Sequence, residues 1–178
     1  MKFLRYRGAL RLVWSQLQVW SMMRDVATMK EKAQAWFGNL LGWGRRRQSG
    51  SAEKLYAEAI RLSRRPEFFQ KYGVADDVDG RFDALSLVVI LVMRRLKALD
   101  GSGKALSQDL FDSMFADMDL SLREMGAGDI GVSKRVRVMA EAFMGRLNTY
   151  VTAIDEDDRE AFSAALVRNL FRGNDAID

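Results

Sequence analysis

Acidic and basic side chains gather in one segment of the sequence, between positions 117 and 135. Carboxylate and guanidinium groups this close together could bind a metal ion, perform acid–base chemistry or pair with charges on a partner protein. Their spacing fits two helices joined by a glycine-containing loop, so we expect them at one helical corner. The residues that we consider as partner-binding candidates, together with the more distant Arg81, are Asp117, Asp119, Arg123, Glu124, Asp129, Lys134 and Arg135.

Three interpretations of this corner are open. The segment can be a solvated helix surface, in which Asp129 or Ser133 caps the second helix and glycines ease the turn. It can be a docking surface, because charges of both signs allow specific pairing with a partner. A metal site built from Asp117, Asp119 and Asp129 is the weakest of the three, because side chains two residues apart diverge on a helix.

The composition restricts the possible chemistry further. The chain contains no histidine and no cysteine, which excludes Cys/His zinc sites and a Ser-His-Asp triad. The glycines at 126, 128 and 131 match a dinucleotide-binding fingerprint, but they follow a helix instead of a strand, so we exclude that function. We therefore expect no metal, no cofactor and no catalysis; an enzyme using only Asp, Glu, Lys or Tyr is the third hypothesis for this chain.

The elements that must position the corner are predicted to be helical throughout, because the sequence has a single proline, Pro66, and apolar residues recur every three to four positions. We expect an all-α fold, a single compact domain of about five to six helices, with Ser51 as the first N-cap. The expected helices span about 51–65, 66–72, 81–98, 106–125 and 132–154, and a last helix is capped by Asp157 or Asp158 and ends near Gly173.

The segment from Arg81 to Ala98 is the most apolar, and we predict that it forms the central, buried helix. The two helices after it carry a series of methionines. These can fill the core or line an adaptable groove for apolar partners, and both interpretations are open. The methionines concerned are Met114, Met118, Met125, Met139 and Met144.

Charge is distributed unevenly along the chain. Positions 1–48 contain ten Lys/Arg and two Asp/Glu, whereas the remaining residues contain eighteen Lys/Arg and twenty-two Asp/Glu. We divide the chain into a basic, amphipathic, Trp-containing helical arm with its Gly/Arg linker (1–50), a helical domain (51–173) and a tail (174–178). The arm can lie on a membrane, pack on the domain, act as a mitochondrial targeting segment or result from an upstream start codon. The candidate membrane-binding or anion-binding residues are Arg5, Arg7, Arg11, Arg45, Arg46 and Arg47.

Several blocks, in order along the chain, resemble the ubiquinol–cytochrome c chaperone family, as a bacterial-type member. The resemblance covers roughly Leu55 to Phe171 and implies an all-helical fold with a role in assembling the cytochrome bc1 complex. In mitochondrial members this role is to bind newly made cytochrome b near the ribosome, with a small helper subunit, before haem insertion. The family has no known catalytic residues. The blocks are Asp79-Gly80-Arg81-Phe82-Asp83, Leu110 to Asp119, Leu122 to Asp129, Lys134-Arg135, Met139 to Phe143 and Gly145-Arg146.

From this resemblance we expect an assembly chaperone for a membrane-protein client, either cytochrome b or another bc1 subunit. The expected location is the cytoplasm, at the inner face of the cytoplasmic membrane, with the mitochondrial matrix as the alternative. The ribosome, a small helper subunit and a peripheral membrane contact are further expected partners, and DNA is not. The alternative function is a ribosome-associated or RNA-associated binding module that uses the arm and Arg45, Arg46 and Arg47.

Overall fold

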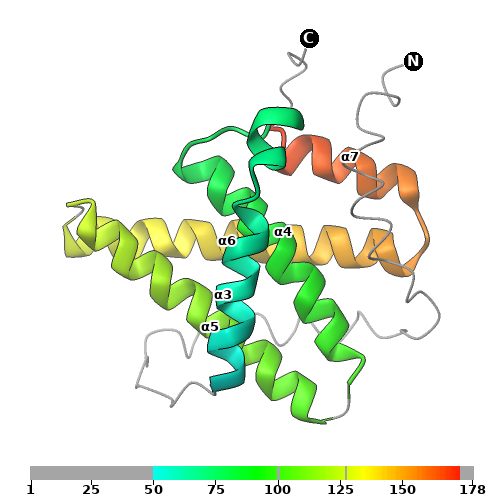
Figure 1. Cartoon of the computed structure of the whole chain (residues 1–178), viewed down its shortest axis with the longest axis horizontal. Helices are drawn as coiled ribbons and strands as arrows, with labels where there is room; N and C mark the ends of the chain where they lie inside the picture. The colour runs from blue at the N-terminus through cyan, green and yellow to red at the C-terminus, as the bar shows by residue number, and fades with distance from the viewer. Residues whose placement is uncertain (1–49, 100, 127, 173–178) are drawn as a thin grey trace.

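The computed structural model of the chain describes residues 50–99, 101–126 and 128–172 (Figure 1). The tail and residues 1–49 of the predicted arm and linker lie outside these ranges, whereas Gly50, predicted as the end of the linker, is the first residue of α3. Within them the chain forms five α-helices, one π-helical turn and no strand, which confirms the all-α fold. The predicted short helix after Pro66 is the π-helical turn η3. The elements are α3 (Gly50–Ser63), η3 (Glu67–Lys71), α4 (Val78–Lys97), α5 (Gly101–Glu124), α6 (Asp129–Asp155) and α7 (Arg159–Asn169).

Helix α4 is the centre of the packing, as its apolar sequence predicted. It contacts α3, α5 and α6, while α3 also lies against α5, and α7 packs on α6 (Figure 1). Side chains on several sides of α4 are almost fully buried, among them Leu87, Val89 and Ile90. In the described ranges, no helix combines the length and the apolar character needed to cross a bilayer.

Aromatic rings join α5 to α6 and α6 to α7. The ring centroids of Phe111 and Phe115 on α5 are 4.5 Å apart, and Phe143 of α6 meets them edge-on at 5.2 and 5.8 Å. Near the other end of α6, Tyr150 meets Phe162 of α7 edge-on at 5.7 Å. Edge-to-face pairs add to the free energy of apolar burial, so these contacts hold α6 between its two neighbours.

The methionines are mainly core residues. Met114 and Met139 are buried, and Met118 and Met144 are partly buried and pack against the core. Met125 is the exception, because 57% of it is exposed. The core interpretation is therefore confirmed for four of the five methionines.

Helix α4 begins three residues earlier than the predicted Arg81. Asp77 caps it, accepting a hydrogen bond at Oδ1 from the backbone N–H of Gly80 at 2.7 Å. The segment from 75 to 80 is therefore not wholly a turn, because Val78 already belongs to the helix. A Cβ at Gly80 would lie 2.0 Å from the carbonyl oxygen of Ala75, so the chain before α4 packs directly on the helix backbone at this glycine.

Helix α5 also begins earlier, at Gly101 instead of Leu106. A Cβ at Gly103 would lie 2.2 Å from the carbonyl oxygen of Leu96, so the start of α5 packs closely on the end of α4. This tertiary contact offsets the low helix propensity of glycine, which is why the sequence alone placed the start too late. Ser51 lies inside α3 and is not its N-cap.

The turn between α5 and α6 differs from the prediction as well. Gly126, with φ of 85°, follows the end of α5, and α6 begins at Asp129 after an N-cap at Gly128 that has no side-chain hydrogen bond. The prediction that Asp129 or Ser133 caps α6 is therefore wrong, since both lie inside the helix. The prediction for α7 is confirmed for Asp158, whose side chain accepts the backbone N–H three residues further along.

We predict opposite effects of alanine at two glycines. Gly80→Ala puts a Cβ against the backbone of Ala75 and should lower the free energy of unfolding by about 1–3 kcal/mol. Gly145→Ala, in α6, meets open space and should raise it by about 0.5–1 kcal/mol, because alanine favours helix. Urea unfolding followed by far-UV circular dichroism measures both. Equal shifts in the two variants would contradict the close packing at Gly80.

Candidate functional site

Arg123 connects the two helices of the charged corner. Its Nε donates to Oδ2 of Asp119 at 2.7 Å, one turn back on α5, and its Nη1 pairs with Oδ1 of Asp129 in the first turn of α6. The hydrogen bonds to these two carboxylates raise the pKa of Arg123. Three of the predicted residues therefore lie together, and they join the end of α5 to the start of α6.

The remaining charges of the corner are exposed. Glu124 ends α5, and Lys134 and Arg135 lie in the second turn of α6. Among residues 50–99, 101–126 and 128–172, none of the three forms an ion pair within 4.0 Å. These side chains can therefore meet a partner without first breaking an ion pair within the described part of the chain.

Asp117 and Arg81 do not join the corner. Oδ2 of Asp117 accepts the hydroxyl of Tyr56 at 2.7 Å, which ties α5 to α3, and burial together with this bond raises the pKa of Tyr56. Arg81 donates from Nε to Asp76 at 2.8 Å, in the turn before α4. Because Asp117 contacts α3 while Asp119 contacts Arg123, these carboxylates do not converge into one set of metal ligands.

Apolar side chains are exposed beside these charges. Leu120 is 54% exposed, Met125 57% and Ile130 89%, and all three lie within ten residues around the α5–α6 turn. In Figure 1 this turn forms the left edge of the molecule and extends beyond the other helices. A projecting surface that mixes large apolar side chains with charges is typical of a protein-binding site.

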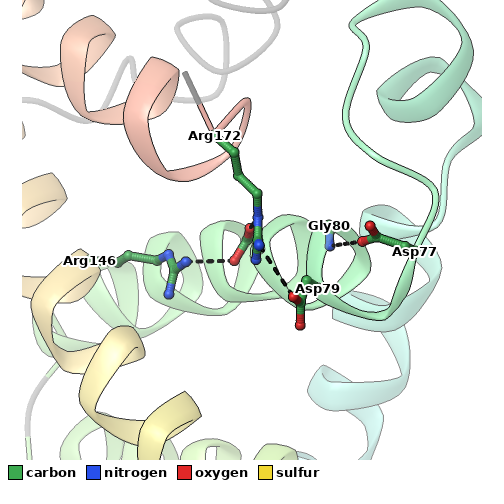
Figure 2. A network of polar contacts seen from close by, with 6 residues as sticks. Asp77, Asp79, Gly80, Arg146 and Arg172 are labelled. Carbon is green, nitrogen blue, oxygen red and sulfur yellow. Dashed lines mark hydrogen bonds and ion pairs between the residues drawn. The ribbon is translucent and has the colours of Figure 1, made fainter. Parts of the chain in front are cut away.

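A second polar cluster, which was not predicted from the sequence, lies at the start of α4. The side chain of Asp83 has no exposed surface, and it accepts Nη2 of Arg146 at 2.7 Å and Nε of Arg172 at 2.8 Å. Figure 2 shows Arg146 approaching from α6 and Arg172 from the chain after α7. Arg172 also reaches Asp79, with Nη1 3.3 Å from Oδ2.

The electrostatics of this cluster reflect its burial. Burial raises the pKa of Asp83, and the charges of Arg172 and Arg146 only partly oppose that rise. Arg146 also lies 5.6 Å from the ring centroid of Phe82, and burial raises the pKa of the neighbouring Tyr150. A buried ion pair of this kind adds little compared with an apolar contact, but the loss of one partner leaves a buried charge unpaired. The cluster therefore acts as an anchor between α4, α6 and the chain after α7.

A further ion pair, between α4 and α6, was also not predicted from the sequence. Nη2 of Arg94, near the end of α4, lies 2.8 Å from Oδ1 of Asp155, the last residue of α6, and both side chains are largely buried.

For Asp83, the sequence did contain one signal, because it is a charged residue within the most apolar helix. Nothing in the sequence indicates its partners, because these lie 63 and 89 residues away.

We predict that Asp83→Asn destabilises the fold, because the largely buried guanidinium of Arg146 loses its carboxylate and Arg172 loses one of its two. The expected loss in the free energy of unfolding is about 3 kcal/mol. Asp79→Asn is the matched control: Asp79 is half-exposed, and in the described part of the chain its ion pair is with Arg172 alone, so the expected loss is below about 1 kcal/mol. Urea unfolding at neutral pH measures both, and similar values for the two variants would contradict the anchoring role of Asp83.

Comparisons with known proteins show which family this chain resembles in sequence and in fold. The family model described as ubiquinol-cytochrome C chaperone matches residues 70–178. A protein of Xenopus laevis named ubiquinol-cytochrome-c reductase complex assembly factor 1 is 28% identical over 120 residues, which are 67% of this chain and 60% of the frog protein. The crystal structure of the Cbp3 homolog from Brucella abortus is similar with a TM-score of 0.64 and 35% identity, over 72% of this chain and 71% of that one.

The matched region contains α4 to α7 with both the Asp83 anchor and the charged corner, and the Brucella structure shares the helical arrangement. The family model alone covers more than half of the chain. The chain therefore belongs to the ubiquinol–cytochrome C chaperone family.

Proposed function

We propose that this chain is an assembly chaperone that binds cytochrome b, or another bc1 subunit, while the ubiquinol–cytochrome c reductase complex is built. The family to which it belongs consists of assembly chaperones for this enzyme complex. A membrane-protein client carries apolar segments that need protection before they are inserted and assembled. In this proposal the chain works at the inner face of the cytoplasmic membrane and binds the client without catalysing a reaction.

The observation that carries the proposal is the exposed apolar corner between α5 and α6. Leu120, Met125 and Ile130 expose most of their surface there, although burying them would be favourable. The exposed charges of Glu124, Lys134 and Arg135 surround them and would set the orientation of a client. We therefore assign client binding to this corner, and we leave Asp117 and Arg81 out of it, because other parts of the fold engage them.

The corner supports binding more than it supports catalysis. The carboxylates Asp119 and Asp129 are both taken by Arg123, and the buried hydroxyls of Tyr56 and Tyr150 have raised pKa values and stay protonated near neutral pH. The arrangement therefore offers charge pairing and apolar contact rather than an activated nucleophile or base.

We predict that replacing the three exposed apolar residues weakens client binding and leaves folding intact. The variant Leu120→Ser with Met125→Ser and Ile130→Ser should recover about tenfold less cytochrome b, since it removes the apolar centre of the surface. The measurement is in-cell crosslinking of the tagged full chain, followed by quantitative mass spectrometry. The control is Val78→Ser with Leu99→Ser, which changes exposed apolar residues at the first position of α4 and just after its end.

Loss of cytochrome b to the same extent in both variants would contradict client binding at the corner. The recovery of ribosomal proteins and RNA alone would favour the alternative of an RNA-associated module.

Deleting the chain from cells should also lower the amount of assembled bc1 complex, measured by the absorption of b-type haem. Normal assembly without the chain would contradict the proposed function itself.

We also propose that the basic arm holds the chaperone near anionic lipid, because each basic residue near such a surface adds about 1 kcal/mol. The residues concerned are Arg5, Arg7, Arg11, Arg45, Arg46 and Arg47. In flotation assays with phosphatidylglycerol vesicles, the full chain should bind strongly at low salt, and a chain lacking residues 1–48 should bind at least about tenfold less. Equal flotation of the two chains would contradict membrane binding by the arm.

A further inference from the structure

Within the described residues, one side of α6 has no neighbouring helix over its first four turns. Ile130, Lys134 and Val138 follow one another at intervals of four residues, so they lie on the same side of the helix. Ile130 is 89% exposed and Val138 55% exposed, and Lys134 is exposed between them. We name this surface, with the adjacent Arg135 and Gly145, the outer face of α6.

The outer face carries positive charge that the described residues leave unbalanced. The two carboxylates of α6 nearest to it are already engaged: Asp129, just before Ile130, pairs with Arg123, and Glu141, one turn after Val138 on the same side of the helix, pairs with Arg137 at 3.0 Å. In residues 50–99, 101–126 and 128–172, no carboxylate lies within 4.0 Å of Lys134 or of Arg135. Two unpaired basic groups therefore lie beside two exposed β-branched side chains.

The backbone of this face is open to a close neighbour. Gly131 and Gly145 lie seven residues before and after Val138, and a Cβ built at either position would meet no atom within 4 Å. Glycine inside a helix is less stable than alanine, and no described contact within the chain requires it at these positions. Small residues allow the backbones of two helices to approach more closely than larger side chains do, so the face suits a helix packed along it.

We propose that the outer face of α6 binds an amphipathic helix of a partner protein, with apolar residues along its centre and carboxylates at its edges. The inference rests on the proposed function in taking the chain to be a protein-binding chaperone, and it adds the chemistry of the segment that is bound. Ile130 and Val138 contact the apolar centre of the partner helix. Lys134 and Arg135 pair with its carboxylates.

Charge excludes the two occupants that this chain could itself supply. Its own basic segment, positions 1–48, has ten Lys/Arg against two Asp/Glu and would be repelled. In a symmetric dimer the face would meet a second copy of itself, so two surfaces of the same positive charge would oppose each other. An anionic membrane fits the charge, but Gly131, Val138 and Gly145 give the face little of the bulky apolar surface that interfacial helices insert.

The test is in-cell crosslinking of the full chain with the photoreactive residue benzoylphenylalanine in place of Val138. Mass spectrometry identifies the crosslinked peptide. We expect a segment of another protein that contains more Asp and Glu than Lys and Arg, with apolar residues every three to four positions. A crosslink to lipid, to residues 1–48, to a second copy or to a basic segment would overturn the proposal, and so would the absence of a crosslink.

Three variants separate the effects of charge and shape on binding from effects on folding. Lys134→Glu with Arg135→Glu should lower the crosslink yield about tenfold, because attraction becomes repulsion. The control Lys54→Glu with Lys104→Glu changes the net charge equally at exposed sites on α3 and α5, and should keep the yield within about twofold. Gly145→Leu should also lower the yield about tenfold, while its urea midpoint stays at or above that of the unchanged chain. Unchanged yields in the first and third variants would contradict the proposed helix.

Different experimental results would contradict this inference and the proposed function. Should bc1 assembly depend on the chain while Val138 crosslinks to no acidic helix, the outer face is not the docking site and the function stands. Should an acidic helix crosslink at Val138 while cells without the chain assemble bc1 normally, the surface stands and the proposed function falls.

Discussion

The carboxylate of Asp83 is buried inside α4 and accepts hydrogen bonds from two arginines that lie far along the chain. Arg146 is 63 residues away and Arg172 is 89 residues away, so three segments of the fold meet at one charged group. Apolar packing makes burial favourable but gives little direction, whereas a buried carboxylate accepts hydrogen bonds only from donors correctly placed around it. The position of α6 and of the chain after α7 relative to α4 therefore depends on this contact.

The backbone at Arg172 is consistent with this dependence. Arg172 has φ of 51°, in the left-handed region that a residue with a long side chain seldom adopts. Such strain persists only where the surroundings hold the residue in place, and here the contacts with Asp83 and Asp79 do so. At the other end of α4, the pair of Arg94 with Asp155 holds the last turn of α6. The body of the domain is thus fixed at both ends of α4.

The sequence predicted the helices well because their cores follow the three-to-four spacing that a helix requires. The central position of α4 followed from its apolar composition, and the location of the corner followed from the spacing of its charges. The starts of α4 and α5 were placed too late, because the close packing at Gly80 and Gly103 is tertiary. The partners of Asp83 and Asp117 were missed for the same reason: a spacing pattern describes one helix at a time.

The α5–α6 corner contributes Leu122 and Val132 to the core, while Leu120, Met125 and Ile130 remain exposed. Arg123 still orders the corner by joining Asp119 to Asp129, so its surface is set before a partner arrives. Pre-organisation of this kind reduces the entropy lost on binding, which leaves more of the contact energy for affinity. Met125 and Ile130 thus belong to the proposed binding surface and remain exposed after folding.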